Sequence, residues 1–136
     1  LIRTRWLVPG RPSARGGDLM AGSGYDTQCD SDGDNSAQAA RTTGTRLFGI
    51  EVSNTNTADA YLQLFNASTS GVTVGSTTPK LSLLVPAGSG SNDGAMDKDF
   101  TDGIEFDTAL TYACTTSATG SGDPSTGLIL NLWFRG

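Results

Sequence analysis

The sequence predicts an all-β fold: an antiparallel, jelly-roll-like β-sandwich preceded by an extended N-terminal arm. Three observations predict it. Five short apolar stretches lie between residues 46 and 134, and none has a convincing helical period. Connections rich in Thr, Ser, Gly, Asn and Asp separate them. The length of 136 residues suits a single domain, which we expect to span residues 46–136, after an arm and loop region at residues 1–45.

The five stretches read as strands because their apolar residues alternate. They are RLFGIEV (46–52), AYLQLFN (60–66), KLSLLVP (80–86), GIEFDTALTYACTT (103–116) and GLILNLWF (127–134). Phe48, Ile50 and Val52 are predicted to share one face. The second stretch carries apolar groups on both faces, which predicts a strand covered on both sides. The fourth is long for one strand, so a bend is expected near residues 108–110.

The segments that connect the five predicted strands are expected to be mostly loops. Long Gly-rich and polar loops are predicted at residues 87–103 and 115–127, and loops of that length usually carry contacts or function. Residues 66–79 form a further polar connection, in which Val72 and Val74 indicate a short strand.

The first 45 residues lack a strand pattern. Pro9, Gly10 and Pro12 break regular structure, and SAQAAR (36–41) suggests one helical turn. The concentrated apolar surface of this region is Trp6-Leu7-Val8. We expect it to pack on the domain or on another subunit, because such a group is costly to leave in water.

Charge divides the chain into a basic arm and an acidic body. Residues 1–17 hold four arginines and no acid, whereas the remainder holds five basic and fourteen acidic residues. The arm residues expected to contact a partner are Arg3, Arg5, Trp6, Leu7, Val8, Arg11 and Arg15. The asymmetry predicts docking on an acidic partner or on a neighbouring copy. A solvated, flexible terminus explains the charges equally well.

Two cysteines leave a disulfide open. Cys114 lies in an alternating apolar run, which favours a buried thiol, whereas Cys29 lies in a polar segment predicted to be a loop. No apolar run approaches the ~20 residues of a membrane-spanning helix, and no signal-peptide pattern is present. We therefore expect no membrane partner.

Catalytic motifs are missing. The chain has no histidine, which excludes Ser-His-Asp, Cys-His and His-based metal sites. No Gly-rich loop has the form that binds phosphate, so no cofactor is expected. Glu51, Glu105 and Asp107 are conceivable carboxylates for glycoside chemistry. Acids at that spacing also occur on any outward strand face, and no cleft is predicted, so we expect no enzyme.

Metal and nucleic-acid sites are disfavoured as well. The segment 30–35 has the alternating carboxylates of a calcium loop, but Asn35 and Arg41 stand where that loop needs Gly and Glu. A second acidic cluster consists of Asp93, Asp97, Asp99 and Asp102. Solvated loop carboxylates account for both. Nucleic-acid binding requires a basic face with aromatics, and the body is acidic, so no nucleic-acid partner is expected.

The order of the strand segments resembles a known class of proteins. RLFGIEVSNTNTADAYLQLFN (46–66), VGSTTPKLSLLVPAG (74–88), GIEFDTALTYACTTSATG (103–120) and GLILNLWF (127–134) are similar to small virion structural proteins of tailed bacteriophages. These residues are structural, and the resemblance covers about two thirds of the chain. It implies a β-sandwich module of a virion, and residues 1–45 take no part in it.

The resemblance implies a non-enzymatic capsid decoration (cement) protein on the outer surface of the phage head. Its partners would be the major capsid protein and neighbouring copies of itself, with a trimer as a plausible state. The alternative is a tail-fibre, spike or receptor-binding β module that recognises cell-surface glycan. In that reading Tyr25, Tyr61, Tyr112 and Trp133 are the aromatic residues that could stack on sugars, although burial in the core is favoured for the last three.

Overall fold

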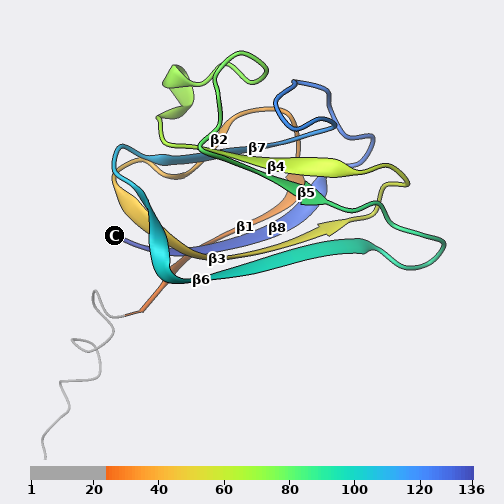
Figure 1. Ribbon diagram of the computed structural model, residues 1–136, viewed down its shortest axis with the longest axis horizontal. Coiled ribbons are helices and arrows are strands. Elements are labelled where there is room, and N and C mark those ends of the chain that lie inside the picture. Colours follow the sequence, from red (N-terminus) through yellow and green to blue (C-terminus); the bar gives the residue numbers. More distant parts are fainter. Residues whose placement is uncertain (1–23) are drawn as a thin grey trace, which may run out of the picture.

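A computed structural model describes residues 24–136, which form an antiparallel β-sandwich (Figure 1). The first sheet has the order β1-β8-β3-β6, with bounds Asp26–Gly33, Leu128–Arg135, Thr45–Asn54 and Gly94–Phe106. The second has the order β2-β7-β4-β5, with bounds Gln38–Arg41, Leu110–Thr115, Ala60–Phe65 and Leu81–Val85. The predicted all-β sandwich is confirmed. Residues 1–23, which include Arg3, Arg5, Trp6, Leu7, Val8, Arg11 and Arg15, lie outside the described residues.

The strand order is that of a jelly roll. β1 pairs with β8, β2 with β7, β3 with β6 and β4 with β5, all antiparallel. The chain thus runs as one long hairpin rolled into two sheets, which is the double Greek-key arrangement of jelly rolls. Viral capsid proteins, lectins and cupins share this architecture, so the fold does not assign a function.

The core lies between the two sheets and follows the predicted alternation. Leu128, Leu130 and Leu132 of β8 are fully buried, and Leu62 and Leu64 of β4 face them from the second sheet. One expected residue departs from its face. The register of β3 shifts between Leu47 and Gly49, so Leu47 enters the core with Ile50 and Val52, while Phe48 is half-buried outside it.

Two loops bury most of the outer face of the second sheet, which we call the covered face, although Leu84 on its edge strand β5 stays 46% exposed. Figure 1 shows the loops that follow β4 and β7 above this sheet. Gln63 and Thr115 are 0% exposed although they point away from the core. Gln63 Nε2 donates to Thr115 Oγ1 at 2.7 Å and to the Gly120 carbonyl at 3.0 Å. Thr111 Oγ1 donates to the Ala67 carbonyl at 2.6 Å. β4 is thus covered on both sides, as predicted.

The segment expected to be arm and loop contains two strands, so that part of the 1–45 prediction was wrong. β1 and β2 are edge strands of the two sheets, and residues 36–41 form no helical turn because Gln38–Arg41 is β2. The sequence of β1, DTQCDSDG, has no apolar face. It is instead held by backbone pairing with β8 and by inward polar groups: Gln28 Nε2 donates to Tyr112 Oη at 3.3 Å, which donates to Asp30 Oδ2 at 2.8 Å.

Two loop boundaries also differ from the expectation. β6 starts at Gly94, so most of the predicted loop at 87–103 is an edge strand with a wide irregularity before Ile104. Its polar sequence follows from its position, since one side of an edge strand faces water. The segment around Val72 and Val74 has a short 3₁₀ turn at Thr69–Gly71 in place of a strand. The bend in the fourth stretch is present, because β6 ends at Phe106 and β7 starts at Leu110.

Candidate functional site

A shallow depression of about 450 Å³ lies at one end of the first sheet. Its lining comes from β3, the end of β6 and the end of the chain, and consists of Gly44, Thr45, Arg46, Phe48, Glu105, Asp107, Arg135 and Gly136. Two arginines and two acids line this one depression. The depression therefore has the polar groups that a ligand site needs. Whether these groups can bind a ligand depends on the contacts that they already make within the chain.

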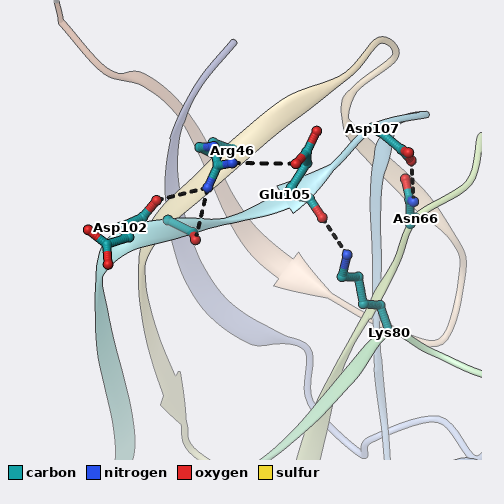
Figure 2. Close-up of polar contacts among 7 residues, drawn as sticks. Arg46, Asn66, Lys80, Asp102, Glu105 and Asp107 are labelled. Atoms are coloured by element: carbon teal, nitrogen blue, oxygen red, sulfur yellow. Dashed lines mark hydrogen bonds and ion pairs between the residues drawn. The ribbon is translucent and has the colours of Figure 1, made fainter.

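Arg46, Glu105 and Asp107 of the depression already have partners within the chain (Figure 2). Arg46 Nη1 donates to the carbonyls of Asp102 and Gly103 at 2.9 and 3.3 Å, and its Nη2 lies 3.4 Å from Glu105 Oε1. Lys80 Nζ donates to the Glu105 carbonyl at 2.5 Å. Arg46 thereby holds the irregular part of β6 against β3. Because both partners of the ion pair are exposed, we expect it to add little to stability.

Asp107 supports the turn between β6 and β7. Asn66 Nδ2 donates to Asp107 Oδ1 at 2.6 Å, and this hydrogen bond is the main cause that lowers the pKa of Asp107. Asn66 Oδ1 accepts from the Thr108 backbone N–H at 2.9 Å. A carboxyl group with a lowered pKa is ionised at neutral pH and is poorly suited to donate a proton as a general acid.

The three carboxylates considered for glycoside chemistry do not form one group. Glu105 pairs across the strands with Arg46, whereas Glu51 lies further along β3 opposite Asp97. Asp107 is bound to Asn66. The structure thus brings Glu105 and Asp107 to the same depression and leaves Glu51 on the sheet beyond it.

An aromatic cluster borders the depression. The Arg135 guanidinium lies 4.8 Å from the ring centroid of Tyr25 and 5.0 Å from that of Phe48, and the two rings are 5.3 Å apart. Tyr25 is 51% exposed, so its ring is available at the surface. Of the other tyrosines considered for sugar stacking, Tyr112 is buried in the core, and Tyr61 is half-buried on the covered face.

The outer face of the first sheet, which we call the open face, has no described loop over it (Figure 1). Its outward side chains on β8 include Ile129, which is 41% exposed, and the half-buried Trp133. Trp133 lies directly over Gly49 of β3, where an added Cβ would come within 1.9 Å of the indole ring. Next to these apolar groups stand three exposed acids at outward positions of β3 and β6: Glu51, Asp97 and Asp99.

The two cysteines are free and lie in different environments. Cys114 is 0% exposed, which confirms the predicted buried thiol, and burial raises its pKa to about 12. Cys29 is exposed on β1 rather than in a loop. Its neighbour across the strands is Asn131 of β8, so it belongs to the open face.

The acidic segments are used by the fold itself. Asp30 Oδ1 accepts from the Asp32 backbone N–H at 2.9 Å, and Asp34 Oδ1 accepts from that of Ser36 at 2.9 Å. Across residues 24–136 no three His, Cys, Asp or Glu side chains gather closely enough to hold a metal ion. The same part of the chain contains no helix long and apolar enough to cross a membrane.

Sequence reasoning named Tyr25 for sugar stacking but missed that Phe48 and Arg135 join it in one cluster. The alternation of the last stretch does place Arg135 on the same side as Trp133, and that signal was available. The irregularity in β3 that places Phe48 in the cluster cannot be recognised from the alternation of residues in the sequence. In comparisons with known proteins, no protein-family model and no curated protein matches this chain.

Proposed function

We propose that this protein is a structural protein of a tailed-phage virion: a capsid decoration protein on the outer surface of the head. It stabilises the shell through non-covalent contacts with the major capsid protein and with neighbouring copies. We assign the protein no catalytic activity, no cofactor or metal, and no nucleic-acid or membrane partner. Its localisation is the virion.

The residues that carry the resemblance support this proposal, because they have structural roles in the sandwich. Asn54 Nδ2 donates to the carbonyls of Ala58, Val85 and Pro86, which ties the turn after β3 to the end of β5. Asn56 Nδ2 donates to the Thr126 carbonyl at 2.8 Å, which fixes the loop before β8. Residues that fix loops in this way give the sandwich a rigid shape, which suits a structural subunit.

The observation that carries the proposal is the difference between the two outer faces. Loops of the chain itself cover β4 and β7 on the covered face, where Gln63 Nε2 donates to the Gly120 carbonyl and Thr111 Oγ1 donates to the Ala67 carbonyl. Leu84 of the edge strand β5 remains exposed beside them. The open face keeps Ile129 and Trp133 of a central strand at its surface. A sandwich with one largely covered face and one open face suits a protein that packs against other subunits in a shell, where many weak contacts add up.

A glycan-binding tail or spike module is the second candidate, and the aromatic cluster favours it. The half-exposed ring of Tyr25 lies beside the depression that holds Glu105 and Asp107. Aromatic faces and carboxylates are the groups that bind sugar rings and hydroxyls. A bound sugar must then displace the ion pair of Arg46 with Glu105 and the hydrogen bond from Asn66 to Asp107, or leave both at the rim of the site.

Immunogold electron microscopy distinguishes the two functions. An antibody raised against the purified chain is applied to intact particles released from cells that carry the gene. Gold over the heads is the expected result, and shells that lack the protein should then break at lower temperature. Gold confined to the tail supports the glycan-binding module, and particles without gold overturn both functions.

A further inference from the structure

We propose that the open face is the docking surface for residues 3–15 of a neighbouring copy of this chain. This inference deepens the proposed function, because it names the surface through which copies of the protein join. Its test uses the purified protein alone. Failure of the test therefore leaves the location of the protein on the particle undecided, and the two proposals can fail separately.

The acids of the open face have no basic partner among the described residues. Glu51 and Asp97 stand directly opposite each other on β3 and β6, and Asp99 stands opposite Gly49. The ion pairs of the described chain are Arg41–Asp26 and Arg46–Glu105, so neither involves these acids. Like charges directly opposite each other on a sheet are unfavourable. A basic segment laid along β3 and β6 removes that repulsion.

An apolar strip runs beside the acids. Ile129 and Trp133 point outward from β8, which is the neighbour of β3 in the sheet. The distance from β8 to β6 is two strand spacings, about 10 Å. One extended segment lying over β3 can therefore contact the apolar strip with some side chains and the acids with others.

A second open face is the wrong occupant. Two such faces packed about a twofold axis at the acids would bring Glu51, Asp97 and Asp99 against the same acids of the partner, and like charges at an interface are costly. The chain itself supplies a basic and apolar segment. Trp6-Leu7-Val8 is preceded by Arg3 and Arg5 and followed by Arg11 and Arg15, and no acid occurs in residues 1–17. Residues 3–15 extended span up to about 43 Å, which matches the 13 residues of β6 and exceeds the 10 residues of β3.

The start of β1 fixes where the described chain enters the sheet. β1 begins at Asp26, opposite Phe134 near the end of β8. Tyr25, just before it, packs against Phe48 and Arg135 at that same end. The described chain therefore begins at this end of the sheet. The open face of a copy placed beyond this end is the surface that we assign to residues 3–15.

Charge-swapped variants of the full chain test the proposal. In the arm variant, Arg3, Arg5, Arg11 and Arg15 are changed to Glu; in the face variant, Glu51→Lys and Asp97→Lys are combined. Sedimentation velocity at low and physiological salt measures self-association. We expect the wild-type chain to associate and each variant alone to raise the dissociation constant about tenfold or more. Added salt should weaken the wild-type complex, since exposed charge pairs are screened.

Mixing the two variants is the decisive measurement. The acidic N-terminal segment of the arm variant then meets the basic open face of the face variant, so the mixture should associate where each variant alone does not. A matched control combines Asp93→Lys and Asp123→Lys, which change the net charge equally at exposed loop positions and should leave association unchanged. Circular dichroism of each variant shows that the sandwich is folded. The proposal is overturned if the wild type stays monomeric, if either variant associates as the wild type does, or if the mixture does not recover.

Discussion

The outer faces of the two sheets of this jelly roll are shielded from water in different ways. Each sheet has an inner face in the core and an outer face that can be exposed to solvent. The central strands of the covered face are closed by the chain's own loops, with Phe65 only 1% exposed and Gln63 fully buried, while Leu84 on the edge strand β5 stays at the surface. The open face keeps Ile129 of a central strand 41% exposed, and the ring of Trp133 lies over Gly49. The difference teaches that an outward position on a central strand is a core position in the second sheet and a contact position in the first.

The largest difference should appear when an apolar side chain is shortened on each face. Phe65→Ala on the covered face should lower the free energy of unfolding by about 3–4 kcal/mol, because it leaves a cavity under the loop after β4. The matched change on the open face, Ile129→Ala, should cost less than about 1 kcal/mol. Urea denaturation followed by circular dichroism measures both. Equal losses would show that the open face is as well packed as the covered one.

The same contrast should hold for amide side chains. Gln63→Leu removes the donor to Thr115 Oγ1 and to the Gly120 carbonyl, which leaves the part-buried Gly120 carbonyl without this partner, while Thr115 Oγ1 still donates to the Ser117 carbonyl. We expect a loss of about 2 kcal/mol and faster proteolysis of the loop at residues 116–127. Asn131→Leu on the open face is the matched control and should change stability by less than about 0.5 kcal/mol. A stable, protease-resistant Gln63→Leu variant would contradict the assigned role of this residue.

The sequence reveals strands through alternation and reveals little of what covers them. The inward residues of β4, β5, β7 and β8 follow from their spacing, as Leu128, Leu130 and Leu132 illustrate. β1 and β6 escape this reasoning because edge strands are held by backbone pairing and tolerate polar side chains on both sides. Alternation also cannot tell which outer face is buried, because that depends on where two irregular loops fold.

The candidate site shows the same limit. The exposure of Ile129 and the acids of β6 can be read from residue types, but their placement on one face with Glu51 depends on strand order, which the sequence does not encode locally. The cluster of Tyr25, Phe48 and Arg135 arises from an irregularity in β3 that displaces Phe48 from its expected face. The basic segment was identified from charge alone.

A smaller effect is expected from filling the space that Trp133 occupies. Gly49→Ala places a methyl group where the indole ring lies, so the ring must move off the open face. We expect a loss of about 1–2 kcal/mol and a red shift of tryptophan fluorescence as Trp133 becomes more exposed. Gly71→Ala is the matched control, since its added Cβ has no neighbour closer than 3.6 Å. Unchanged fluorescence in Gly49→Ala would show that the ring does not rely on this glycine.

The smallest effect on stability is expected at Cys29. Its thiol is exposed on the open face, whereas Cys114 is buried with a pKa raised to about 12, so at pH 8 Cys114 remains a protonated thiol shielded from reagent. A thiol-specific reagent should therefore modify one cysteine in the folded chain and two after unfolding in urea. Cys29→Ser should abolish the first reaction and change the free energy of unfolding by less than about 0.5 kcal/mol. If the folded Cys29→Ser variant still reacts quickly, the sheet opens often enough to expose Cys114, and the inner faces are less firmly closed than their burial indicates.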